Sequence, residues 1–111
     1  MRHLLVFLAI LAVLPSLSCP DEADAFTRLC EKRKACFPGT FTGDYGSVSD
    51  CAEYERSYND LMAENFGDEC AAAAMPIVEC VADPGQSCDA FNDEPTYCPT
   101  ERQTWEQICQ N

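Results

Sequence analysis

Apolar residues recur at helical spacing in the middle of the chain. Between Ser47 and Gly67 they follow at steps of three or four, with acidic residues largely between them. The apolar positions are Cys51, Tyr54, Tyr58, Leu61, Met62 and Phe66. Ser47 with Asp50 forms a capping pair, and Gly67 suits a helix end. The pattern predicts a long helix with this stripe turned towards the core.

Three further helices are predicted by weaker patterns. Residues Asp24–Cys36 repeat apolar positions at helical spacing, and Asp68–Val81 is an alanine-rich stretch in which Pro76 should kink or divide the helix. Thr100–Gln103 has the form of a capping box for a short last helix. The inward face of that helix would carry Trp105, Ile108 and Cys109.

Two stretches rich in proline and glycine are expected to be loops, at 37–46 and 83–99. The fold prediction is therefore an all-α domain, a small helical bundle stapled by disulfides. It would have three longer helices, one short C-terminal helix and two long loops, over residues 26–111.

The N-terminus reads as an export signal. Arg2 precedes an unbroken apolar run, residues 4–14, which Pro15 ends. Such a run is too short to cross a bilayer, which takes about 20 residues. A basic start, an apolar stretch and small residues at the exit are typical of a secretory signal peptide. We expect residues 1–18 to be that signal and the protein to be exported, with residues 19–25 as a short tether.

Nine cysteines in 111 residues indicate a disulfide scaffold in an oxidising compartment. The segment Leu14–Cys19 resembles a bacterial lipobox, although Ser16 stands where that family usually has Leu. The resemblance implies a diacylglyceryl thioether on Cys19. The remaining eight would close four bridges: Cys30, Cys36, Cys51, Cys70, Cys80, Cys88, Cys98 and Cys109. Their pairing cannot be predicted, because eight cysteines allow 105 connectivities.

Other fates of Cys19 remain open at this stage. An ordinary signal peptidase could cut just before it, and a cut after Ala25 would discard it. Cys19 could also pair and leave another thiol free, or bridge a dimer.

The overall layout is similar to that of the small cysteine-rich exported lipoproteins of myxobacteria and related Gram-negative bacteria. A signal, one lipidated cysteine and an even set of others carry the resemblance. It implies a cell-envelope location and a helical disulfide domain. No activity-bearing motif accompanies it.

The composition of the chain argues against several classes of binding and catalytic activity. With 19 acidic residues against 7 basic ones, the chain is unsuited to binding nucleic acid. The only histidine, His3, would leave with the signal, so the common nucleophile and metal arrangements lack their imidazole. No pair of cysteines has the spacing of a zinc or redox motif. We therefore expect no cofactor, no metal and no enzymatic activity.

Two features are candidates for binding. Phe37, Phe41 and Tyr45 lie four residues apart in the first predicted loop, where they could hold a protein or glycan partner or simply complete the core. The second is a basic segment: Arg28, Lys32, Arg33 and Lys34 precede a stretch, 35–111, with a balance of −13. That segment could lie on anionic lipid headgroups, or it could pair with the acidic body.

The predicted function is an envelope-anchored, non-enzymatic interaction or structural module, with a membrane partner reached through the lipid on Cys19. The alternative is a freely secreted ligand, toxin-like factor or inhibitor.

Overall fold

Helices account for nearly all of the residues, 22–110, that the computed structural model describes, and none of these residues lies in a strand. The predicted all-α, disulfide-stapled fold is confirmed. The elements are α1 (Glu22–Cys36), α2 (Pro38–Asp44), α3 (Val48–Phe66), α4 (Asp68–Ala82), the 3-10 helix η2 (Cys88–Phe91), α5 (Glu94–Tyr97) and α6 (Pro99–Cys109). The expected signal peptide and Cys19 lie outside the described residues.

The ends of α3 are set by the residues that the sequence pattern indicates. The backbone N–H of Asp50 donates to Oγ of Ser47 over 3.0 Å, which satisfies one of the free donors of the first turn. At the other end Gly67 has a φ of 97°, a conformation that a side chain would strain. The chain turns there and enters α4 directly.

Pro76 does not divide α4, which was one of the two effects expected of it. The helix is continuous from Asp68 to Ala82 with Pro76 inside it. The carbonyl left without a donor belongs to Ala72, four residues earlier. Both Pro76 and Ala72 are exposed, so water can reach this side of the helix and replace the missing hydrogen bond.

Three other prolines lie in the first turns of helices. Pro38 and Pro95 lie in the first turns of α2 and α5, inside stretches expected to be loops. Pro99 opens α6 with Cys98 as the N-cap, so the predicted capping box at Thr100 is wrong. A proline at the first helical position costs nothing, because the N–H it lacks would have no partner there.

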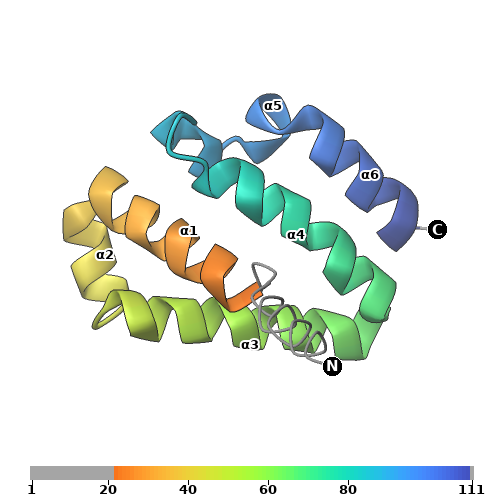
Figure 1. Cartoon of the computed structure of the whole chain (residues 1–111), viewed down its shortest axis with the longest axis horizontal. Coiled ribbons are helices and arrows are strands. Elements are labelled where there is room, and N and C mark those ends of the chain that lie inside the picture. Colours follow the sequence, from red (N-terminus) through yellow and green to blue (C-terminus); the bar gives the residue numbers. More distant parts are fainter. Residues whose placement is uncertain (1–21, 111) are drawn as a thin grey trace, which may run out of the picture.

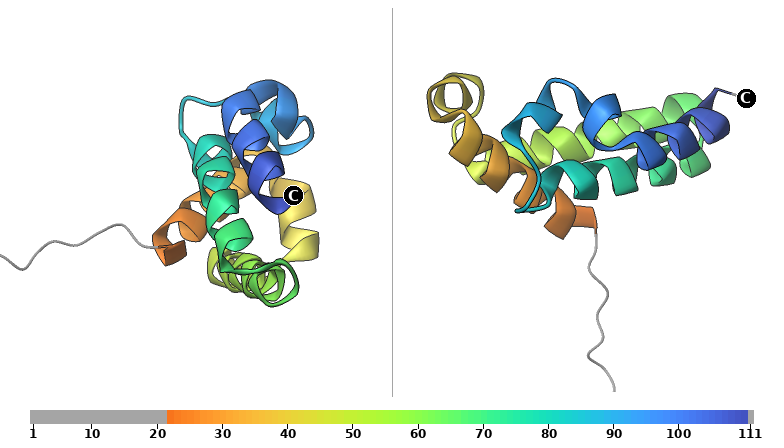
Figure 2. Two further views of the ribbon diagram at one scale, coloured as in Figure 1. Left: turned by 90° about the vertical axis from the view of Figure 1, so that its right-hand side faces the viewer. Right: turned by 90° about the horizontal axis from the view of Figure 1, so that it is seen from above.

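The helices are arranged around α1, which packs against both α3 and α4 (Figure 1). Helix α6 runs along α4 towards the end of the molecule opposite α2 (Figure 2). Two apolar clusters flank α1, one including Phe26 and Phe41 and the other Leu29 and Val81, and Val78 packs against both. Because α1 begins over the middle of α3, it covers only the first half of that helix (Figure 1).

All eight cysteines of the described domain are paired, as the sequence predicts. Cys30–Cys51 joins α1 to α3, and Cys36–Cys88 joins α1 to η2. Cys70–Cys109 and Cys80–Cys98 join α4 to the end and to the N-cap of α6. The bridges thus connect helices that already pack together, and they hold α6 to α4 at both ends.

The Cys36–Cys88 bridge closes the longest loop, 52 residues, and Cys88 is exposed. Replacing both cysteines by alanine should lower the free energy of unfolding by about 4 kcal/mol, because a loop of this size then regains its freedom in the unfolded chain. Urea unfolding of the double variant, beside the parent protein, measures this. A loss below about 1 kcal/mol would show that the bridge constrains little.

Candidate functional site

The three aromatic residues proposed as a binding loop all border one cavity, and Phe41 is also part of the core. Phe41, on α2, is 3% exposed and completes the core beside Phe26. Phe37 packs edge-on against Phe91 of η2, with ring centres 5.7 Å apart. Tyr45 follows α2, and the centre of its ring lies 5.2 Å from that of Phe41. Both Phe37 and Tyr45 keep part of their surface exposed.

These residues line a cavity of about 410 Å³ between α1, α2 and η2. Phe37, Phe41, Tyr45 and Phe91 supply aromatic walls, and Arg33 of α1 supplies a cation. The remaining lining residues are Thr40, Asp44 and Asn92. A cavity of this size with aromatic walls and a few polar groups can accept one ring of a sugar or one aromatic side chain.

Arg33 is held in place by partners from three elements. Its Nη1 donates to Oε2 of Glu55 over 2.9 Å and to the hydroxyl of Tyr45 over 3.2 Å. The guanidinium carbon also lies 5.2 Å from the centre of the Phe91 ring and 5.7 Å from that of Tyr45. Because Glu55 offsets its charge, Arg33 acts mainly as a rigid flat wall between the two rings.

Burial raises the pKa of the Tyr45 hydroxyl above its ordinary value of 10.0. The Arg33 cation acts in the opposite direction, while Glu55, Asp44 and Tyr54 reinforce the rise. Tyr45 is therefore a neutral hydrogen-bonding group in the cavity at physiological pH.

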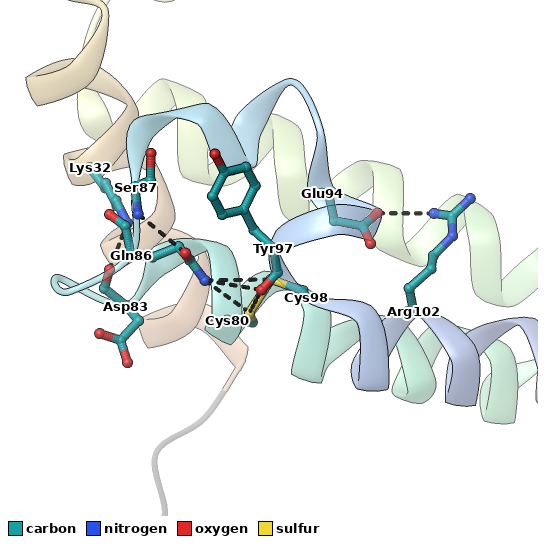
Figure 3. Close-up of a disulfide and its surroundings, with 9 residues drawn as sticks. All are labelled: Lys32, Cys80, Asp83, Gln86, Ser87, Glu94, Tyr97, Cys98 and Arg102. Atoms are coloured by element: carbon teal, nitrogen blue, oxygen red, sulfur yellow. Dashed lines mark hydrogen bonds and ion pairs between the residues drawn. A yellow bond between two sulfur atoms is a disulfide. The ribbon is translucent and has the colours of Figure 1, made fainter.

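The basic segment of α1 makes contacts with the body of the domain. Nζ of Lys32 donates to the carbonyls of Asp83 and Gln86 over 2.6 and 2.7 Å (Figure 3). Burial lowers the pKa of this ammonium, and the charge of Asp83 partly opposes the effect. Arg33 pairs with Glu55, whereas Lys34 is exposed. Arg33 thus pairs with an acidic side chain of the body, as the second interpretation of the basic segment expects, whereas Lys32 is held by backbone carbonyls.

Cys80, Cys98 and Glu101 bring two sulfur atoms and a carboxylate within 4.8 Å of one another. The two sulfurs are bonded to each other, so neither can act as a thiolate ligand. Gln86 covers this bridge, its Nε2 lying 3.4 Å from both Sγ of Cys80 and the carbonyl oxygen of Tyr97 (Figure 3). The group is a structural crosslink.

The apolar stripe of α3, which the sequence pattern predicts to face the core, forms a second candidate surface. On α3, Tyr54, Tyr58, Leu61 and Phe66 are all more than half exposed. Cys51 is buried and bonded to Cys30 of α1, whereas Tyr54, one turn further along α3, is already exposed. Periodicity alone could not reveal this, because a helix face has the same spacing whether or not another element lies over it.

The comparisons with known proteins identify no relative. The chain matches no protein-family model, no curated protein and no solved structure.

The cavity geometry predicts a distinct titration. Subtracting the ultraviolet absorbance titration of a Tyr45→Phe variant from that of the parent should leave one phenol with a midpoint above its ordinary value of 10.0, because burial disfavours the phenolate. Retention of the fold in the variant, checked by circular dichroism, makes the subtraction valid. A midpoint at or below the ordinary value would mean that Tyr45 is solvated and that the cavity wall is open.

Proposed function

We propose that this protein is an exported binding module, tethered to an envelope membrane through a lipid on Cys19 and acting without catalysis. The observation that supports the tether is the complete pairing of the eight cysteines of the domain. Cys19 is the ninth cysteine, so the even set needs no thiol from it. The four bridges also suit an oxidising compartment outside the cytosol.

The lipid on Cys19 would be the part of the protein that enters the membrane. No helix among the described residues is long and apolar enough to cross a bilayer. A diacylated N-terminal cysteine places two acyl chains at one point, and two chains suffice for stable anchoring. Two residues separate Cys19 from the first residue of α1, Glu22, so the folded domain would stand close to the membrane.

The surface of the domain has features of a binding site and lacks a histidine for catalysis. The aromatic cavity beside α2 offers stacking walls and one neutralised arginine. The only histidine of the chain is His3, inside the expected signal peptide. A rigid, acidic, disulfide-stapled surface can hold a protein or glycan partner in a fixed orientation without moving protons or electrons.

The intact mass of the mature protein tests the tether. Processing and acylation at Cys19 should give a chain that begins at residue 19 and is heavier than its amino acids by several hundred daltons. The protein should enter the detergent phase when a nonionic detergent solution is warmed, because two acyl chains outweigh the acidic body.

A Cys19→Ser variant is the matched control, since it changes one atom at the proposed lipid site. It should lose the added mass and partition into the aqueous phase. An unmodified mature chain that stays aqueous in the parent protein would refute the tether and favour the alternative, a freely secreted ligand or inhibitor.

A further inference from the structure

The exposed face of α3 continues into a groove. A hollow of about 330 Å³ lies between α3, α4 and the start of α6, with Tyr58 and Met62 on one side, Ala74 and Ile77 as its floor, and Trp105 opposite. A smaller hollow of about 90 Å³ shares Tyr58 and Met62 and extends to Leu61 and Phe66. The two form one apolar strip, which we call the α3 groove.

The length of the α3 groove matches a helix. The residues of α3 that line the two hollows run from Glu55 to Phe66, which is twelve residues or about 16 Å at the rise of an α-helix. An amphipathic helix of three to four turns would lay its apolar face along that strip, with anchors at every third or fourth residue. Exposed aromatic and leucine side chains of this kind are typical of interface anchors.

The charge around the α3 groove specifies the other face of such a helix. Helix α3 alone carries five acidic residues and one basic residue, Arg56. Two carboxylates line the groove itself: Glu55, which is paired with Arg33, and Glu94. The cation in the groove, Arg102, is already paired with Glu94 and Glu106 at 3.0 and 3.2 Å. An apolar strip with an acidic rim is complementary to apolar residues flanked by Lys or Arg.

Glu94 gives a second, local indication of a cationic ligand. Its Oε1 accepts from Arg102 (Figure 3), while its Oε2 is buried and receives no hydrogen bond from the described residues. A buried carboxylate oxygen without a donor is costly. Glu94 borders the groove, so the ammonium or guanidinium of a ligand seated there would lie close to this incompletely neutralised carboxylate.

We propose that the α3 groove binds an amphipathic helix with a basic polar face, presented by a partner protein. This inference rests on the proposed role as a binding module and names its partner class, and it does not depend on the lipid. An anionic membrane surface is the less favoured occupant, because the carboxylates on the rim would be repelled by its headgroups.

The test uses Trp105, the single tryptophan of the chain, as the reporter in the groove. The mature protein is placed in phosphatidylcholine vesicles, or in buffer if its mass shows no lipid, and titrated with three synthetic helices of sixteen residues that lack tyrosine and tryptophan. All three carry the same leucine stripe, and their polar faces are Lys, Gln or Glu. The Lys peptide should shift the Trp105 emission to shorter wavelength and saturate at micromolar concentration, and the Glu peptide should not bind.

Substitutions test whether the peptide binds in the α3 groove. Leu61→Ser with Phe66→Ser removes two exposed anchors without opening the core, and should weaken the Lys peptide about tenfold or more. Glu94→Gln should weaken the Lys peptide about fivefold and leave the Gln peptide unchanged, because only Lys gains from the carboxylate. Glu79→Gln, exposed and outside the groove, removes the same charge and should change binding by less than about twofold.

Three results would overturn the proposal. They are no change in Trp105 emission with the Lys peptide, equal binding of the Glu peptide, or equal losses from Glu94→Gln and Glu79→Gln. Vesicles containing phosphatidylglycerol provide a further arm: a shift of Trp105 emission without peptide would assign the α3 groove to the membrane. Failure of the peptide arms leaves the mass of Cys19 untouched, so it is distinguishable from failure of the proposed tether.

Discussion

Disulfide bonds occupy the places in this domain where large apolar side chains would normally meet. Among the residues whose burial the structure describes, the largest side chains that are fully buried are one phenylalanine, Phe26, and three cysteines, Cys30, Cys51 and Cys98. Much of the remaining core is alanine. Cores of such small residues bury little apolar surface per helix, so packing alone offers a small margin against the entropy of the unfolded chain. The four bridges reduce that entropy and allow a thin core to hold six helices.

The position of α1 follows from this constraint and determines which surfaces remain open. Cys30–Cys51 fixes α1 over the first half of α3, and Cys36–Cys88 fixes its other end against η2. The cavity with Arg33 forms where these elements meet. The second half of α3 extends past α1, which leaves its apolar stripe facing solvent as the α3 groove. One helix, held by two bridges, therefore positions both candidate binding surfaces.

The sequence is most informative where a local interaction decides the structure. The cap at Ser47, the end at Gly67 and the even set of eight cysteines could all be predicted, because each depends on a few neighbouring residues or on parity. The effect of the prolines could not be predicted from composition: Pro38, Pro95 and Pro99 lie in the first turns of helices, and Pro76 lies on an exposed face of α4. Their effect depends on whether an N–H is needed at that point, which composition does not reveal.

The candidate sites could not be fully predicted from the sequence, because they depend on how the helices pack together. Phe37, Phe41 and Tyr45 are equally spaced in the chain and all border the cavity, yet only Phe41 is buried in the core. The exposed stripe of α3 has the periodicity of a core face, and its exposure depends on where another helix begins. Arg33 became a site residue only through partners at positions 45, 55 and 91, far from it in the chain.

Disulfide mapping of the native protein tests this account most directly. Digestion without reduction, followed by mass spectrometry of the linked peptides, should recover the pairs Cys30–Cys51, Cys36–Cys88, Cys70–Cys109 and Cys80–Cys98, with Cys19 in none of them. A peptide that links Cys19 to any of the eight, or a different pairing for Cys30 or Cys36, would contradict it, because α1 would then be held elsewhere.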